Sequence, residues 1–180
     1  MSILVVGTGR CGTTTVTRIL HENLGYNMGE HFCMDRSNAF HCFEEDVLYN
    51  TDMGLVNGTL SFPMWQKFVS SKITANYERY GEDWGFKSPS LCYTLPVWLP
   101  YFKSLPIIIF VQRDTDLVVK SFMRCYGWGE GQAVNEVNNR IKHMNIFGVF
   151  IAHANIRFTA ERRSDEDVEK ELDKILKGAF

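Results

Sequence analysis

The chain has 180 residues, of which 19 are Lys or Arg and 21 are Asp or Glu, so its formal net charge at pH 7 is −2. A domain of this length buries about 70% of the surface of its unfolded chain, enough to hold a core without disulfides or a structural metal. The near balance of charge excludes the broad basic field of a non-specific nucleic-acid binder, so we expect no nucleic-acid partner and only a local site for an anion. We expect one domain that spans residues 1–180.

The cysteines and the first residues indicate a reducing compartment. The five cysteines are odd in number and irregularly spaced, and the chain opens without a basic segment or a small-residue cleavage site. The longest apolar run, residues 107–111, is far shorter than the about 18 residues that a membrane span requires. We therefore expect a cytoplasmic protein that does not enter a membrane.

In the first half of the chain a short apolar run precedes two helical patterns. Residues 3–6 form a branched apolar run typical of a buried strand, and residues 13–24 repeat apolar side chains at helical spacing. Residues 25–62 have weak periodicity, so we expect short irregular elements there that line a substrate cleft. An aromatic-rich helical pattern over residues 63–80 begins at a proline and ends before Gly81.

The second half alternates strands and helices. Residues 84–87 and 107–111 predict strands, and the prolines between them predict a bent helix or a pair of helices. A helix, a glycine-rich loop and a long helix ending near Asn155 follow. A strand over residues 156–159 then precedes a final amphipathic helix, for which Asp165 is the expected N-cap. Strands that alternate with helices predict an α/β fold with three layers, α/β/α, around a parallel sheet.

A glycine-rich segment, Gly7–Thr14, lies between the first strand and the first helix. At such a junction, backbone N–H groups and the positive end of the helix dipole converge on an anion. Two known patterns overlap there. One is G-x-G-x-x-G of dinucleotide-binding folds, and the other is G-x-x-x-x-G-K-[ST] of the P-loop nucleotide-binding type, in which Thr13 replaces the lysine.

Each pattern lacks one part. A dinucleotide site needs a second apolar strand that ends in an acid about 20 residues further on, and residues 21–30 supply an acid without a strand. A P-loop NTPase without its lysine loses the cation that reaches the β- and γ-phosphates. Arg10 places a cation inside the loop instead.

The loop and a second motif resemble those of the PAPS-dependent sulfotransferases, which have a P-loop-like fold. The phosphosulfate loop of that family carries a cation, a glycine and then Ser or Thr. The corresponding residues of this chain are Arg10, Cys11, Gly12, Thr13 and Thr14. In the same family an Arg at the end of a buried strand and a Ser eight residues later grip the 3′-phosphate of the donor. Arg113 and Ser121 have this placement and spacing, so the resemblance implies that they bind the donor together with the loop.

The resemblance also implies the catalytic residues. Lys87 resembles the strand-end lysine of the family, so Lys87 and Arg10 are expected to stabilise the leaving phosphate. The small-molecule branch has a catalytic His where this chain has Pro89, so another base is needed. Glu30 follows the first helix, where carbohydrate- and protein-directed members have a Glu, and is the candidate base, with His31 as the second candidate.

The implied activity is transfer of a sulfuryl group from PAPS, with PAP as product and without a metal ion. The acceptor is a hydroxyl or amine of a small molecule, a carbohydrate or a peptide. Two alternatives stay open, a P-loop nucleotide kinase or NTPase with a degenerate loop and a non-catalytic nucleotide-binding module. The missing loop lysine argues against the kinase, and the pair of Arg113 and Ser121 argues for the sulfotransferase.

Overall fold

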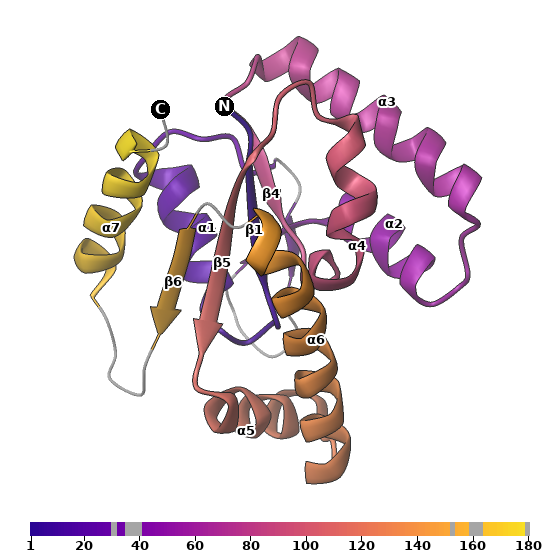
Figure 1. Ribbon diagram of the computed structural model, residues 1–180, viewed down its shortest axis with the longest axis vertical. Coiled ribbons are helices and arrows are strands. Elements are labelled where there is room, and N and C mark those ends of the chain that lie inside the picture. The colour runs from indigo at the N-terminus through magenta and orange to yellow at the C-terminus, as the bar shows by residue number, and fades with distance from the viewer. Residues whose placement is uncertain (30–31, 35–40, 152–153, 159–163, 179–180) are drawn as a thin grey trace.

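The computed structural model of the chain describes residues 1–29, 32–34, 41–151, 154–158 and 164–178 (Figure 1). The main sheet has four parallel strands in the order β4-β1-β5-β6, with β4 at Gly85–Lys87, β1 at Ile3–Gly7, β5 at Ile107–Arg113 and β6 at Ala154–Phe158. Within it β1 pairs with both β4 and β5, so Ile3 lies opposite Gly85 on one side and Ile107 on the other. A separate antiparallel pair consists of β2, Phe32–Met34, and β3, His41–Glu45.

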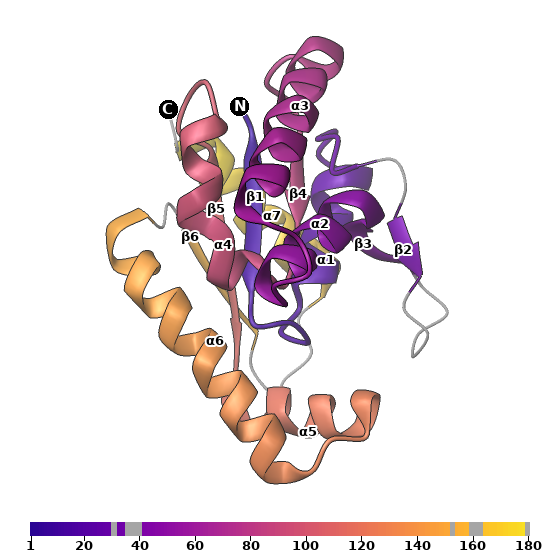
Figure 2. The same cartoon turned by 90° about the vertical axis from the view of Figure 1, so that its right-hand side faces the viewer.

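Helices cover both faces of the main sheet. They are α1 (Thr13–Glu22), α2 (Asp46–Val56), α3 (Phe62–Tyr80), α4 (Leu91–Trp98), a 3-10 helix η1 (Leu99–Tyr101), α5 (Thr115–Tyr126), α6 (Glu130–Ile151) and α7 (Asp165–Gly178). Figures 1 and 2 show α1 and α7 on one face, α3 and α4 on the other, and α5 beyond the carboxyl ends of the strands. The predicted three-layer α/β/α architecture is therefore confirmed. Over the described ranges, no helix combines the length and the apolar run that crossing a bilayer needs.

The continuous apolar runs of β1 and β5 follow from burial of both faces of the sheet. Successive strand side chains point to opposite faces, so in β1 Ile3 and Val5 pack with α1 and α7, and Leu4 and Val6 pack with α3 and α4. Each of these side chains is fully buried, and burying one contributes about 1.5–3 kcal/mol. Burial of side chains on both faces of β1 fixes its carboxyl end between β4 and β5.

Most predicted elements are confirmed, and the differences arise from contacts distant in sequence. The strands predicted at residues 3–6 and 107–111 are β1 and β5, and the final helix is α7. Asp165 is the first residue of α7, and Oγ of the preceding Ser164 accepts the hydrogen bond from the N–H of Asp167 that was expected of an Asp165 cap. However, α6 ends at Ile151, before the predicted end near Asn155, and β6 begins at Ala154, earlier than the predicted 156. Ala154 pairs with Ile109 of β5, and this pairing draws the segment into the sheet.

Residues 25–62 are more regular than their weak periodicity suggested, because they contain α2 and the antiparallel pair. The apolar pattern of α2 is interrupted by Asp52, an ionisable residue that is nevertheless fully buried. The helix predicted over residues 63–80 is α3, with Pro63 in its first turn and Gly81 after its end at a φ of 63°. The predicted bent helix is α4, with Pro96 inside it, followed by η1.

Candidate functional site

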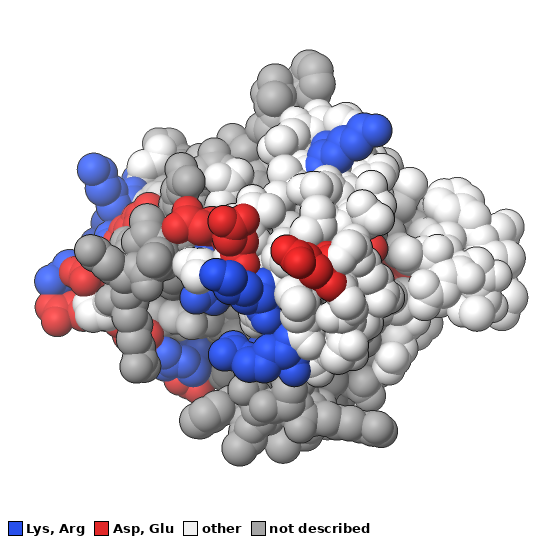
Figure 3. Space-filling view, turned by 90° about the horizontal axis from the view of Figure 1, so that it is seen from below, with Lys and Arg blue, Asp and Glu red and all other residues white. Residues whose placement is uncertain are grey.

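The candidate site lies at the carboxyl ends of β1 and β5, which run side by side at the centre of the sheet. Open α/β sheets bind their ligands in the crevice at this edge. The segment Gly7–Thr14, here called the glycine loop, joins the end of β1 to the start of α1. Figure 3 looks onto this end of the molecule and shows Lys and Arg atoms gathered near the middle of the face, with Asp and Glu atoms beside them.

The backbone of the glycine loop turns sharply at three positions. Gly9, Arg10 and Gly12 have positive φ angles of 79°, 57° and 103°. Among the described residues Arg10 is the one non-glycine with positive φ, a conformation that costs about 1–2 kcal/mol. Turns that mix left- and right-handed backbone direct successive N–H groups toward one side, which is typical of anion-binding loops. Such strain concentrates at functional sites.

Gly7 allows the loop to fold back onto the strand. A Cβ atom on Gly7 would lie 2.5 Å from Sγ of Cys11, 2.6 Å from Cγ2 of Thr13 and 3.1 Å from the carbonyl oxygen of Val111. The side chains of Cys11 and Thr13 are buried beneath the loop. Burial raises the pKa of the Cys11 thiol, so this thiol stays protonated. Both side chains support the shape of the loop.

The positive end of α1 adjoins the glycine loop. The N-cap residue is Gly12, no side chain caps the helix within the described residues, and its first turn carries no acid. The partial positive charge at the start of the helix therefore remains to act on an anion. Thr14, in the first turn, is half-buried with its side chain at this end of the helix.

The structure brings Arg10 and Ser121 together. Nε of Arg10 donates a hydrogen bond to Oγ of Ser121 at 3.2 Å, which links the loop to α5 across 111 residues of sequence. Ser121 is buried. Arg113 is the last residue of β5, at the strand end where the sequence predicted it, and is half-buried beside a hollow. Its joint contact with Ser121 to a phosphate stays a prediction.

The hollow beside Arg113 has a volume of about 500 Å³, within the range usual for small-molecule sites. It is lined by Thr8 of the glycine loop, by residues 111–116 and Val118 of β5 and α5, and by Ile141, Met144 and Asn145 of α6. Its charged groups are the guanidinium of Arg113 and the carboxylates of Asp114 and Asp116. A ligand in the hollow would therefore meet both signs of charge next to the glycine loop.

Lys87 approaches the loop from the opposite side. It ends β4, pairs in register with Val5 of β1 and is 4% exposed. Its positive charge opposes the upward shift that burial imposes on the pKa of Cys11. Its role in catalysis stays a prediction, as do the anion contacts of the loop residues.

The two candidate bases, Glu30 and His31, lie outside the described residues. Gly29 is the last described residue before them, and its N–H donates to Oδ1 of Asn27 at 2.9 Å. The assignment of a base to Glu30 or His31 therefore stays a prediction.

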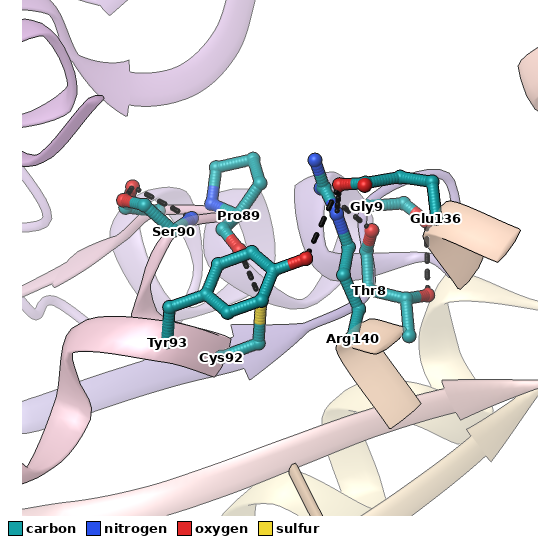
Figure 4. A network of polar contacts seen from close by, with 9 residues as sticks. Thr8, Gly9, Pro89, Ser90, Cys92, Tyr93, Glu136 and Arg140 are labelled. Atoms are coloured by element: carbon teal, nitrogen blue, oxygen red, sulfur yellow. Dashed lines mark hydrogen bonds and ion pairs between the residues drawn. The ribbon is translucent and has the colours of Figure 1, made fainter. Parts of the chain in front are cut away.

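A cation that the sequence analysis did not single out reaches the glycine loop from α6 (Figure 4). Nη1 of Arg140 donates to the carbonyl oxygen of Thr8 at 2.9 Å, and Nε of Arg140 donates to Oε1 of Glu136 at 2.7 Å. The hydroxyl of Tyr93 on α4 donates to the same Glu136 oxygen at 3.3 Å. Because 132 residues separate Arg140 from Thr8, no local pattern could have revealed the contact.

A buried carboxyl group was also missed. Oδ1 of Asp52 accepts hydrogen bonds from the indole N–H groups of Trp65 and Trp98 at 3.0 and 2.8 Å. Oδ2 accepts from the hydroxyls of Ser90 and Thr94 at 2.7 and 2.8 Å. Asp52 thereby joins α2 to α3, α4 and the segment after β4. That segment, which includes the Ser88 hydroxyl 2.5 Å from that of Ser90, follows Lys87 directly.

The sheet order, the helix layers and the glycine loop place this chain in the class of P-loop α/β proteins. No family model matches the chain, and no curated protein does. Among solved structures, shikimate kinase from Acinetobacter baumannii in complex with shikimate has a TM-score of 0.65 and 14% identity, covering 99% of this chain and 93% of that chain. Shikimate kinase from Bacteroides thetaiotaomicron has a TM-score of 0.63 and 11% identity, covering 98% of each chain. A gluconokinase from Sinorhizobium meliloti has a TM-score of 0.57 and 12% identity, covering 98% of this chain and 91% of that chain.

These neighbours share the fold, and they correct one prediction. They are kinases, so the prediction of a PAPS-dependent sulfotransferase is wrong, and the alternative of a P-loop kinase with a degenerate loop is better supported. The physical reason is that sulfuryl and phosphoryl transfer need the same glycine loop, helix end and cations. In the sequence, the placement and spacing of Arg113 and Ser121 favoured the sulfotransferase, and a shared phosphate contact of these two residues stays a prediction.

Proposed function

We propose that this protein is a phosphotransferase of the P-loop kinase type, which binds a nucleoside triphosphate on the glycine loop and transfers its terminal phosphoryl group. The observation that carries the proposal is the conformation of Gly7–Thr14. This segment turns at three positive φ angles directly before the uncapped start of α1, the arrangement that suits a phosphate chain. The kinase fold of the structural neighbours supports the same function.

Phosphoryl transfer needs positioning and positive charge more than covalent chemistry by the protein. In the proposed complex, backbone N–H groups of the loop and the dipole of α1 hold the phosphates. Arg10 within the glycine loop and Lys87 at the end of β4 add positive charge to the proposed phosphate site. The nucleotide enters as its Mg²⁺ complex, so the metal ion belongs to the substrate.

The hollow at the end of β5 suits the acceptor. Arg113 would hold an anionic group of the acceptor, and Asp114 or Asp116 would take the proton of the attacking hydroxyl. The hydroxyl oxygen then bonds to the terminal phosphorus while the bond from that phosphorus to the bridging oxygen breaks. Shikimate and gluconate, which the names of the neighbours give, are small hydroxylated acids. We propose an acceptor of that class.

Thermal melting with different nucleotides tests the donor. A ligand at about 100 times its dissociation constant adds ~2.7 kcal/mol, which raises the melting temperature of a chain of this size by about 5–10 °C. We expect ATP with Mg²⁺ to produce such a shift and chelation of Mg²⁺ to reduce it. Stabilisation by PAP alone, without a response to any nucleoside triphosphate, would overturn the proposal.

A matched pair of glycine variants tests whether the loop is the binding site. Gly12 and Gly25 both have positive φ, 103° and 77°, so Ala strains the backbone at either position. Gly12→Ala is expected to lower ATP affinity about tenfold or more, the size of one charge-assisted hydrogen bond, and Gly25→Ala to leave it unchanged. Formation of ADP with shikimate, gluconate and related hydroxy acids then tests transfer. Binding without any ADP formation would favour a non-catalytic nucleotide-binding module.

A further inference from the structure

Arg140 lies over the middle of the glycine loop although it belongs to α6. In addition to its bond with the carbonyl of Thr8, its Nη1 atom is 3.3 Å from the position that a Cβ atom on Gly9 would take. The absence of a side chain at Gly9 therefore lets the guanidinium rest on the loop backbone. Figure 4 shows Arg140 reaching Thr8 and Gly9 from α6.

The guanidinium is held in this place by three groups. Glu136, one turn earlier on α6, accepts from Nε, and Tyr93 of α4 donates to the same carboxylate. The guanidinium carbon also lies 5.4 Å from the centre of the Phe122 ring, a cation–π contact. The Arg140 side chain is 14% exposed. A cation fixed in this way loses little conformational freedom when it binds an anion.

The glycine loop has no cation at position 13. Position 13, where the P-loop pattern has its lysine, carries a threonine whose methyl group packs beneath Gly7. Arg10 is turned toward α5 and donates to Ser121. A guanidinium has five N–H donors. In the described residues Arg140 donates one hydrogen bond from Nε to Glu136 and one from Nη1 to Thr8. Its planar fork suits phosphate oxygens.

We propose that Arg140 supplies from α6 the positive charge that the glycine loop lacks at position 13, and that it contacts the outer phosphates of the bound nucleotide. This inference rests on the proposed nucleotide site. The hydrogen bond from Arg140 to Thr8 holds the guanidinium against the loop backbone before the ligand binds. Helix α6 is thereby part of the phosphate-binding machinery, and the position of the cation depends on the packing of α6 against α4 and α5.

The test compares ligands that differ in phosphate number. Dissociation constants of ATP, ADP and AMP with Mg²⁺, and of inorganic tripolyphosphate, are measured by calorimetry for the wild type, Arg140→Met and Arg140→Lys. Arg140→Met is expected to weaken ATP and tripolyphosphate binding about 10- to 100-fold, as for a lost charge-assisted hydrogen bond, and AMP binding less than about threefold. Arg140→Lys keeps the charge and is expected to recover part of the loss. The exposed Lys142 on the same helix provides the control, since Lys142→Met should change none of these constants.

A merely structural role for Arg140 predicts a different pattern. Loss of the Thr8 contact alone would weaken ATP and AMP by the same factor, and this result would overturn the inference. Since Arg140→Met leaves Glu136 with the hydroxyl of Tyr93 but without the guanidinium of Arg140, the variant Glu136→Gln/Arg140→Met removes both charges, and circular dichroism checks that it folds. If neither folds, the ratio of ATP to AMP affinity in Arg140→Lys decides, and an unchanged ratio overturns the inference.

The same measurements separate this inference from the proposed function. If the wild type binds tripolyphosphate through Arg140 but no nucleotide, the proposed function fails and the role of Arg140 as a phosphate ligand stands. If the wild type binds ATP and Arg140→Met keeps the full preference for ATP over AMP, the inference fails and the proposed function stands. Absence of binding to nucleotides and tripolyphosphate alike overturns both.

Discussion

At the scale of single residues, Asp52 is a carboxyl group without exposed surface whose two oxygens accept four hydrogen bonds. A buried carboxylate is tolerated when its lone pairs are satisfied in this way. The sequence could not predict its burial, because an Asp in the interior of a helix usually faces solvent. Here the donors come from α3, α4 and the segment after β4, which are distant in the chain.

The pH dependence of stability is expected to carry the signature of Asp52. Burial raises its pKa above the reference value of 3.8 and outweighs the hydrogen bonds, which lower it. Between the unfolded and folded pKa values the folded state therefore holds more protons, so the contribution of this group is complete below the unfolded pKa and is lost as pH rises through the folded pKa. We expect the free energy of unfolding of the wild type, measured in urea, to fall relative to Asp52→Asn as pH rises from about 4.

Asp83 provides the control for this measurement. Its carboxylate is 76% exposed and pairs with the N-terminal ammonium, so Asp83→Asn is the matched replacement of a carboxylate outside the core. A free energy of unfolding of the wild type that rises with pH relative to that of Asp52→Asn would show instead that the site stabilises the charged form of Asp52.

At the scale of elements, α7 is attached to α1 by two kinds of contact. Leu172 is fully buried in the core shared by the two helices. On the surface, Nη2 of Arg18 contacts Oδ2 of Asp165 at 2.6 Å, with 33% and 57% of the two side chains exposed. Solvent screens such an exposed pair, so the apolar contact carries most of the attachment.

This comparison gives a stability prediction. Leu172→Ala is expected to lower the free energy of unfolding by about 2–5 kcal/mol, because it removes buried methyl groups and leaves a cavity. Arg18→Ala is expected to lower it by about 1 kcal/mol or less. Urea unfolding followed by circular dichroism measures both, and equal losses would show that the ion pair contributes as much as the core.

The predictable elements are those whose signal is local. A run of branched residues marks β1 and β5, and an amphipathic repeat marks α7. The glycine loop was also predictable, since the residues that define its pattern all lie within one segment of eight residues, Gly7–Thr14. Arg140 was not, because α6 has a mostly polar pattern and the contact with Thr8 exists only once the sheet and helices are assembled.

At the scale of the whole molecule, the parallel sheet gathers side chains from distant segments at one end. Arg10 ties α5 to the glycine loop, and Arg140 ties α6 to it. A ligand that orders the loop should therefore also steady these two helices, which lie beyond the carboxyl ends of the strands and along one face. The same arrangement explains why the sequence predicts a P-loop-like fold but does not distinguish transfer of a sulfuryl group from transfer of a phosphoryl group, since the loop alone serves either reaction.

Hydrogen exchange tests this coupling. On addition of ATP with Mg²⁺, amides of residues 115–126 in α5 and 130–146 in α6 are expected to exchange more slowly, because opening of either helix then breaks a contact with an occupied loop. Amides of α7, which is attached to α1 on the opposite face, are expected to change little. Protection confined to residues 7–14 would show that the loop binds its ligand without the helices.

The buried thiol of Cys11 gives the loop a chemical sensitivity. Oxidants attack thiolates that they can reach, and this sulfur is both inaccessible and protonated while it lies under the backbone beside Gly7. Oxidation of Cys11 therefore requires the loop to open first. A phosphate that holds the loop closed would also shield the sulfur, so the resistance of the protein to peroxide at this position rises with occupancy of the site.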